Sequence, residues 1–138
     1  MLFRKSKKRV LVADDDEDFL NVIRSVLEFA GFAVDTAEDG ETALKEIKRH
    51  RYDLLILDVV MPRIDGIKLF RMVRKSKRFA GIPTLLVSGT LSTERLEERQ
   101  SEIIKRAEGY IQKPFKTKEF LDEVRTLVEE SRVSLKSS

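Results

Sequence analysis

The chain has 138 residues, of which 41% are hydrophobic, 37% charged and 7% aromatic, and this length fits one domain that buries its own core. It contains no cysteine and a single histidine, His50, which excludes disulfide scaffolds, thiolate metal sites, cysteine catalysis and multi-histidine metal sites. The net charge of +3 arises from a local charge of +5 in residues 1–9, because the rest of the chain carries 22 basic and 24 acidic residues.

The basic excess defines an N-terminal arm, residues 1–8, which precedes the domain. A secretory signal would need an apolar stretch of about 7–15 residues after such an arm, but the run Val10–Ala13 stops at Asp14. No apolar run approaches the ~20 residues of a membrane-spanning helix. We therefore expect a cytoplasmic protein.

Five short β-rich runs alternate along the chain with segments of helical periodicity. Strands are expected at Arg9–Ala13, Ala33–Ala37, Asp53–Asp58, Pro83–Ser88 and Gly109–Gln112. The nearly continuous apolar runs VLVA, LLILD and TLLVS are typical of strands covered on both faces. Apolar residues at helical spacing predict helices from Phe19 to Ala30, from Ala43 to His50, around Ile67–Val73, over Thr93–Arg106 and over Lys118–Glu130.

The repeated strand–helix alternation predicts an α/β fold, with right-handed crossovers and a parallel sheet between two layers of helices. We expect no second domain: the domain covers residues 9–130, and a polar tail, residues 131–138, is expected to fray. His50 is expected to lie at a helix end.

Acidic residues follow the first and third predicted strands. In a doubly wound sheet, ligands bind beyond the carboxyl ends of the strands where the strand order reverses, and with the order 2-1-3-4-5 the first and third strands are neighbours there. Asp14, Asp15 and Asp58 would then converge, and they would repel one another unless a cation joined them. Oxygen ligands suit Mg²⁺ or Mn²⁺. For Asp16, Glu17 and Asp18, a simple role as N-cap and helix-dipole partners competes with a role in binding.

Two further polar residues are expected at the same edge of the sheet. Ser88 ends the fourth predicted strand, and Lys113 follows the fifth. Taken alone, Ser88 would be an ordinary hydroxyl at the end of a strand, and Lys113 an ordinary solvated charge. Together with a carboxylate and a metal ion, they are the groups that a phosphorylated aspartate would need, because cations neutralise phosphoryl oxygens and a hydroxyl donates to them.

Four segments carry a resemblance to a known family: VLVADD at 10–15, LLILDVVMPRIDG at 54–66, TLLVSG at 84–89 and YIQKPF at 110–115. Over about residues 8–130 the chain resembles the receiver domain of two-component response regulators, of the stand-alone type. The resemblance implies a flavodoxin-like five-stranded sheet of order 2-1-3-4-5. It also implies a role in phosphorelay signal transduction.

The resemblance further implies a Mg²⁺-dependent phosphoryl transfer to Asp58 from the phosphohistidine of a sensor histidine kinase or phosphotransfer protein. The metal would be held by Asp14, Asp15, Asp58 and the backbone carbonyl of Val60, with Mn²⁺ as a substitute. Such a domain catalyses its own aspartyl phosphorylation and dephosphorylation without being a classified enzyme.

A switch is implied as well. Ser88 and Lys113 correspond to the switch hydroxyl and the phosphoryl-pairing lysine, and Tyr110 to the aromatic residue that turns inward when the hydroxyl moves toward the phosphate. The face formed by the fourth helix, fifth strand and fifth helix would then act on an unknown downstream protein or form a phosphorylation-dependent homodimer. A cis Lys113–Pro114 bond is also implied.

The chain departs from the family pattern in two places. Ser88 and Tyr110 are 22 positions apart, a longer interval than is usual, and the extra residues fall within Thr90–Arg106. Val60 and Thr90 occupy positions that influence how water reaches the phosphoryl group. An apolar Val60 should not orient a hydrolytic water, so slow self-dephosphorylation is expected. We also expect no output domain in this chain.

Three alternatives compete with this interpretation. A haloacid-dehalogenase-like phosphatase would need Thr or Val at position 18, which is Asp18. A pseudo-receiver would never carry phosphate, although all five expected site residues are present. A nucleic-acid-binding regulator would use the basic arm and the basic residues of the third helix and its exit, but no recognition motif accompanies them; these residues are Arg71, Arg74, Lys75, Lys77 and Arg78.

Overall fold

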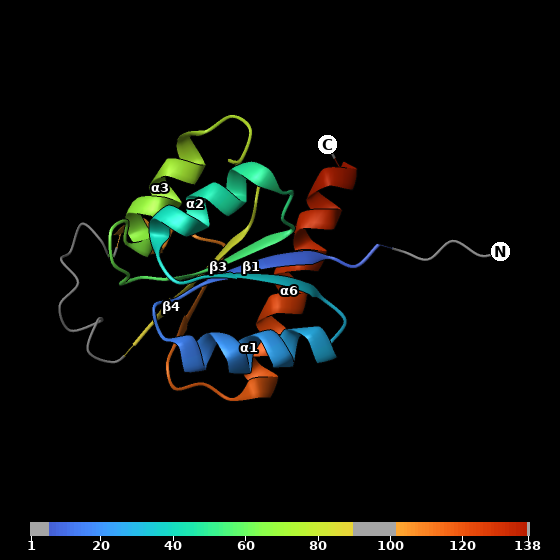
Figure 1. Ribbon diagram of the computed structural model, residues 1–138. Coiled ribbons are helices and arrows are strands. Elements are labelled where there is room, and N and C mark those ends of the chain that lie inside the picture. Colours follow the sequence, from blue (N-terminus) through green and yellow to red (C-terminus); the bar gives the residue numbers. More distant parts are fainter. Residues whose placement is uncertain (1–5, 90–101, 138) are drawn as a thin grey trace.

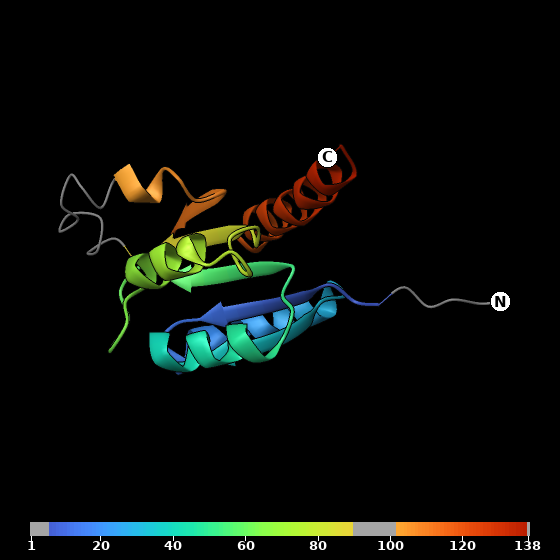
Figure 2. The ribbon, with the colours of Figure 1, turned by 90° about the horizontal axis from the view of Figure 1, so that it is seen from above.

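Five parallel strands form one sheet in the computed structural model, which describes residues 6–89 and 102–137. The strands are β1 (Arg9–Ala13), β2 (Ala33–Ala37), β3 (Leu54–Asp58), β4 (Thr84–Ser88) and β5 (Gly109–Gln112), and the longer helices are α1 (Glu17–Phe29), α2 (Gly40–Arg49), α3 (Gly66–Lys75) and α6 (Thr117–Ser137). The strand order is β2-β1-β3-β4-β5, as Figure 2 shows from above. The predicted fold and strand order are therefore confirmed.

The sheet separates two hydrophobic clusters, each covered by one pair of helices (Figure 1). Leu11, Leu55 and Leu86 face the cluster that α2 and α3 cover, whereas Val10, Ile56 and Val87 face the cluster that α1 and α6 cover. This division follows from the alternation of side chains along a strand. Each fully buried Leu, Ile or Val contributes roughly 1.5–3 kcal/mol, which is why the interior positions of the three central strands are apolar.

Aspartates start three of the helices. The side chains of Asp16, Asp39 and Asp65 accept hydrogen bonds from backbone N–H groups in the first turns of α1, α2 and α3. The competing interpretation of Asp16 as an N-cap is thus confirmed. At the other end of α1, Gly31 adopts a positive φ of 101°, a conformation that glycine tolerates best and that commonly ends helices.

Several element boundaries differ from the predicted ones by a few residues. β3 begins at Leu54, and Asp53 just before it joins β1 through two hydrogen bonds: its N–H donates to the Arg9 carbonyl, and its side chain accepts from the Arg9 N–H. β4 begins at Thr84, since proline lacks the N–H that a strand residue donates. α6 continues to Ser137, beyond the start of the tail expected at residue 131, because no glycine or proline interrupts the sequence from Thr117.

The predicted fourth helix, Thr93–Arg106, lies largely outside the described residues; of its described part, residues 102–104 are helical. Among the residues that the structure does describe, no helix combines the length and the hydropathy that crossing a membrane would require.

Candidate functional site

The carboxyl ends of β1 and β3 bring three carboxylates together. These strands are neighbours in the sheet, with Ala13 opposite Leu57, so Asp14 and Asp58 leave it side by side. Asp14, Asp15 and Asp58 each offer an oxygen within 4.8 Å of the others. Asp14 and Asp58 are buried, whereas Asp15 is exposed. The convergence expected from the sequence is therefore present.

Lys113 reaches this cluster from the end of β5. Its Nζ lies 2.7 Å from Oδ2 of Asp14 and 4.0 Å from Oδ2 of Asp58. The ammonium also lies 3.9 Å from the centre of the Phe19 ring, a cation–π contact. The Lys113–Pro114 peptide bond that follows is cis, as the resemblance implies. In this state the lysine pairs mainly with Asp14 and only approaches Asp58.

The Asp58 carboxyl is the most perturbed acid of the site. Burial, and then repulsion from Asp14, raises the pKa of Asp58 to about 7, although the nearby Lys113 ammonium and the Val60 N–H act in the opposite direction. That N–H donates to Oδ1 of Asp58 over 3.3 Å. Because the carboxylate is desolvated, any added cation would favour its ionised form.

The loop after β3 is held close to Asp58. The Gly66 N–H donates to the Val59 carbonyl over 3.0 Å, and Asp65 caps the helix that starts at Gly66. A β-carbon at Gly66 would lie 1.9 Å from the backbone oxygen of Asp58. Only glycine allows α3 to start this close to the site.

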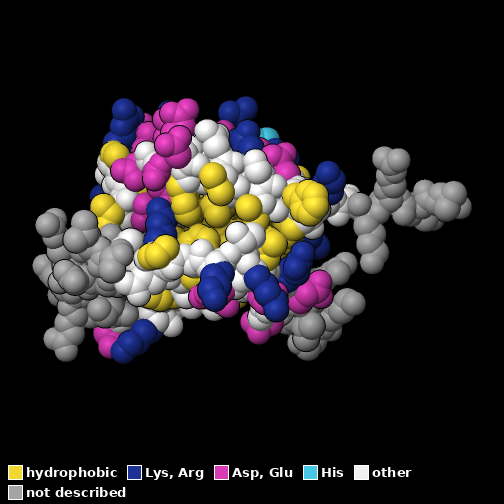
Figure 3. Space-filling view, turned by 90° about the horizontal axis from the view of Figure 1, so that it is seen from below, with side chains coloured by type: hydrophobic (Ala, Val, Ile, Leu, Met, Phe, Trp, Pro, Cys, Tyr) yellow, Lys and Arg dark blue, Asp and Glu magenta, His cyan; other side chains and the backbone are white. Residues whose placement is uncertain are grey.

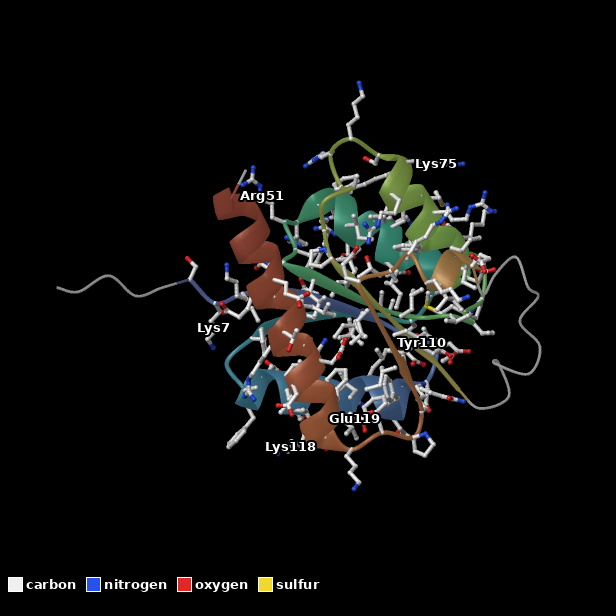
Figure 4. All side chains as sticks on the ribbon, turned by 180° about the vertical axis from the view of Figure 1, so that it is seen from behind. Lys7, Arg51, Lys75, Tyr110, Lys118 and Glu119 are labelled. Carbon is white, nitrogen blue, oxygen red and sulfur yellow. The ribbon has the colours of Figure 1, made fainter. Side chains whose placement is uncertain are left out.

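Ser88 and Tyr110 meet beside the cluster. Ser88 is fully buried at the end of β4, one residue beyond Val87, the neighbour of Asp58 in the sheet. Its hydroxyl hydrogen-bonds to the Tyr110 hydroxyl over 2.5 Å. The Tyr110 side chain, labelled on β5 in Figure 4, is 38% exposed. A single hydrogen bond thus connects the buried end of β4 with the molecular surface.

The donor set fits a hard divalent cation. When ionised, three carboxylates face one ammonium, so the site carries an excess of two negative charges. All of the acidic donors are oxygens, which Mg²⁺ prefers. An acidic pocket of this kind is typical of a Mg²⁺-binding phosphoacceptor site.

An apolar groove adjoins the site, and sequence reasoning did not identify it. It has a volume of about 310 Å³ and lies between α1 and the β5–α6 connection. Figure 3 shows hydrophobic side chains gathered on this side of the molecule. Val22 belongs to the apolar residues at helical spacing in α1, yet its side chain is 60% exposed. The lining residues include Phe19, Val22, Val26, Lys113, Phe115 and Phe120.

A family model described as the response regulator receiver domain matches residues 10–125. The chain belongs to this family. Receiver domains act in two-component signalling and are phosphorylated by histidine kinases. The family assignment and the type of fold made from the four sequence segments are therefore confirmed, and the acidic cluster is consistent with a phosphorylation site.

Receiver domains of known proteins are similar to this chain over most of its length. It is 34% identical over 124 residues to response regulator MprA of Mycobacterium leprae, a match covering 90% of this chain and 52% of that protein. It is 33% identical over 131 residues to the alkaline phosphatase synthesis transcriptional regulatory protein PhoP of Bacillus subtilis, a match covering 95% of this chain and 52% of that protein. The chain spans about half the length of these curated relatives.

Two solved structures illustrate the shared receiver fold. A CheY-like receiver domain protein from Methanospirillum hungatei superimposes with a TM-score of 0.84 and 25% identity, covering 94% of this chain and 99% of that chain. The chemotaxis response regulator CheY4 of Vibrio cholerae gives a TM-score of 0.77 with 28% identity, covering 88% of this chain and 99% of that chain.

Proposed function

We propose that this receiver domain accepts a phosphoryl group on Asp58 from the phosphohistidine of a sensor histidine kinase or phosphotransfer protein. The observation that carries the proposal is the convergence of Asp58 with two further carboxylates and Lys113 at the strand ends. The reaction would take place in the cytoplasm and require Mg²⁺. The residues that would hold the ion are Asp14, Asp15, Asp58 and, through its backbone carbonyl, Val60; Mn²⁺ would serve in its place.

The bond changes are simple. A carboxylate oxygen of Asp58 forms a bond to phosphorus, the phosphorus–nitrogen bond of the phosphohistidine breaks, and the nitrogen keeps the electron pair. Bound Mg²⁺ would supply positive charge against the phosphoryl oxygens. Asp58 attacks only in its ionised form, and with a pKa of about 7 only part of the carboxyl is ionised at neutral pH, so a bound cation that lowers this pKa would increase the reactive fraction.

Lys113 has a second role in this proposal. A phosphoryl group adds acceptor oxygens and roughly one further negative charge at Asp58. The Lys113 ammonium is already 4.0 Å from Asp58, so a small movement away from Asp14 would pair it with the phosphoryl oxygens. The Phe19 ring would keep the ammonium close to the site, because the cation lies over its face.

Ser88 would report the phosphorylation. Its hydroxyl hydrogen-bonds to the Tyr110 hydroxyl, and a movement of Ser88 toward a phosphoryl oxygen would pull the two hydroxyls apart. Tyr110 would then turn inward and alter the face around β5 and α6, which acts on a downstream protein or a second copy of the chain. The Ser88–Tyr110 pair would thus change between two arrangements in response to the negative charge added at Asp58.

The donor protein would dock on the apolar groove. A phosphohistidine that reaches Asp58 brings its own protein surface against the rim of the site, and Lys113 belongs both to the site and to the lining of the groove. The exposed Val22 would add apolar contact area to such an interface.

Slow loss of the phosphoryl group is part of the proposal. The Val60 side chain is 54% exposed beside Asp58, and an aliphatic side chain has no group that orients an attacking water.

We propose domain limits of 9–130, with the basic arm 1–8 and the tail 131–138 outside them. Direct DNA binding is less well supported, because Arg74 in the basic cluster pairs with Glu108 and covers the Phe70 ring.

Intact-mass measurement with acetyl phosphate tests the central claim. Wild type should gain one phosphoryl group in Mg²⁺ and none in excess EDTA, and Asp58→Ala should gain none. Asp122→Ala, which removes an exposed carboxylate of α6, serves as the matched control and should label normally. A labelled Asp58→Ala protein, or equal labelling in EDTA, would contradict the proposal.

A further inference from the structure

A second group of potential metal ligands lies outside the phosphoacceptor site. Asp35 in the middle of β2, and Glu46 and His50 at the end of α2, each offer one ligand atom within 4.8 Å of the others. Figure 4 shows Arg51, which follows His50, at the end of the molecule away from Tyr110. The cluster therefore lies apart from Asp58 and has no part in phosphoryl transfer.

The His50 imidazole lies beside Glu46 at the end of α2. Its Nε2 lies 3.6 Å from Oε2 of Glu46, four residues earlier, which is too long for a hydrogen bond. Two ligands of one tetrahedral zinc ion lie roughly 3.3–3.5 Å apart. Within the part of the chain that the structure describes, the imidazole makes no hydrogen bond, and the Tyr52 ring packs against it at 6.1 Å between centres.

Asp35 is held in a fixed orientation by neighbours that use only one of its oxygens. The Tyr52 hydroxyl and the Arg9 Nε both donate to Oδ2 over 2.8 Å. Over the described ranges, 6–89 and 102–137, no hydrogen-bond donor contacts the other oxygen, Oδ1. Hydrogen bonds of this kind orient the ligands of metal sites, and Oδ1 carries no hydrogen bond that an ion would have to displace.

The charges at the cluster select the kind of ion. Arg9 pairs with Asp35, and Arg49 lies 3.7 Å from the other oxygen of Glu46, so the two carboxylates are largely balanced already. Mg²⁺ and Ca²⁺ bind through oxygen ligands and gain little from such a site. An imidazole nitrogen with two carboxylate oxygens suits Zn²⁺ and its neighbours in the first transition row.

We infer that Asp35, Glu46 and His50 bind one divalent transition-metal ion of the Zn²⁺ class. The three side chains are 27%, 22% and 32% exposed, so an ion reaches them from solvent without opening the fold. Bound there, it links β2 to the end of α2, because its ligands come from both elements. The inference is independent of the proposed phosphoryl transfer.

Titration of the full chain with Zn²⁺ in excess Mg²⁺ tests this inference. His50 is the single histidine, so its imidazole NMR signals report on this cluster alone, and calorimetry reports the stoichiometry. One equivalent of Zn²⁺ should shift those signals to saturation. His50→Ala and Glu46→Gln should each weaken binding by roughly 10–100-fold or more, and Tyr52→Phe, which loosens Asp35, by about 10-fold.

Two controls separate this site from the rest of the surface. Asp58→Ala removes one carboxylate of the phosphoacceptor cluster, and Glu41→Gln removes an exposed carboxylate from the same helix as Glu46; in both variants the His50 signals should respond to Zn²⁺ as they do in wild type. Unchanged Zn²⁺ affinity in His50→Ala and Glu46→Gln would overturn the inference, as would equal displacement by Mg²⁺. If the His50 imidazole signals respond to pH but not to Zn²⁺, His50 forms only an ion pair at the helix end, and the inference is wrong.

Discussion

Asp58 combines burial with a role that requires a charge. The carboxyl is only 8% exposed and lies beside Asp14, so in the absence of a metal it retains its proton up to a pH of about 7. Its ionisation is therefore coupled both to folding and to cation binding. The site therefore favours cation binding, because a bound cation offsets the desolvated negative charge of the acidic cluster.

The first prediction concerns the pH dependence of stability without metal. The pKa of Asp58 is raised in the folded state to about 7, so the folded state binds more protons than the unfolded chain between the ordinary carboxyl pKa and that value. The contribution of Asp58 to the free energy of unfolding is thus fully present below the ordinary pKa and is lost as the pH rises through about 7.

Urea unfolding in EDTA at pH 5 and pH 8 checks this prediction. The free energy of unfolding of wild type, relative to Asp58→Asn, should decrease between the two pH values, because the asparagine variant lacks the titrating group. Mg²⁺ should reduce the decrease. A difference that does not change with pH, or that grows toward pH 8, would be incompatible with a raised pKa at Asp58.

At the scale of single elements, the start of α3 sets the shape of the phosphoacceptor loop. The helix begins at Gly66 directly against the backbone of Asp58. A larger residue would push α3 and the loop 59–65 away from the site. The position of the helix is therefore determined by a close backbone contact as well as by its apolar face.

The second prediction follows from that contact. Gly66→Ala places a β-carbon 1.9 Å from the Asp58 carbonyl oxygen, and relief of the clash should lower the free energy of unfolding by about 1–3 kcal/mol. Gly81→Ala is the matched control, since a β-carbon there meets no atom within 4 Å. Thermal and urea melts of both variants provide the measurement, and equal stabilities would argue against the close contact.

The third prediction concerns the coupling of β4 to β5. Ser88→Ala should leave Asp58 open to phosphorylation but remove the hydroxyl that links the site to Tyr110. Amide chemical shifts with a beryllofluoride mimic measure the coupling: wild type should respond both near Asp58 and around Tyr110, the variant only near Asp58.

Tyr110→Phe provides the comparison. This variant removes the tyrosine hydroxyl from the same hydrogen bond and should lower the free energy of unfolding by about 0.5–1.5 kcal/mol. The Ser88 hydroxyl stays available to a phosphoryl group. If Ser88→Ala shows the same distal shifts as wild type, the signal does not pass through this hydroxyl.

On the scale of the whole molecule, the sheet places different surfaces around its two ends. The carboxyl ends of the strands carry the acidic cluster, with the apolar groove of α1 at its side. The group formed by Asp35, Glu46 and His50 lies apart from both. Substitutions can therefore affect docking, phosphoryl transfer and the second cluster separately.

The fourth prediction separates docking from chemistry. Val22→Glu places a charge on the exposed apolar rim of the groove, and it should slow phosphoryl transfer from a phosphorylated histidine kinase by about 10-fold, or roughly 1.4 kcal/mol. Phosphorylation by acetyl phosphate should not change, because a small donor needs no protein interface.

Met72→Glu is the matched control. Met72 is also exposed, but it lies on α3, on the opposite face of the sheet. This variant should behave as wild type with both donors. If Val22→Glu slows phosphorylation by acetyl phosphate as much as it slows transfer from the kinase, the substitution has damaged the phosphoacceptor site and not docking.

The sequence by itself determined the order of the elements, the parallel sheet and the placement of Asp14, Asp15 and Asp58 after strand ends on one edge of the sheet. These features follow from local patterns, since strand periodicity fixes where each strand ends and parallel strands end at the same edge. The N-cap role of Asp16 is equally local, because donor and acceptor lie three residues apart.

Tertiary structure alone decided which partners the charged groups take. Lys113 and Asp14 are 99 positions apart, and nothing in the sequence indicates that the lysine pairs with Asp14 more closely than with Asp58. The contact of Phe19 with that lysine and the meeting of Asp35 with His50 are likewise products of helix packing on the sheet. Sequence patterns repeat over a few residues, whereas these distances depend on how whole helices and strands come to lie against one another.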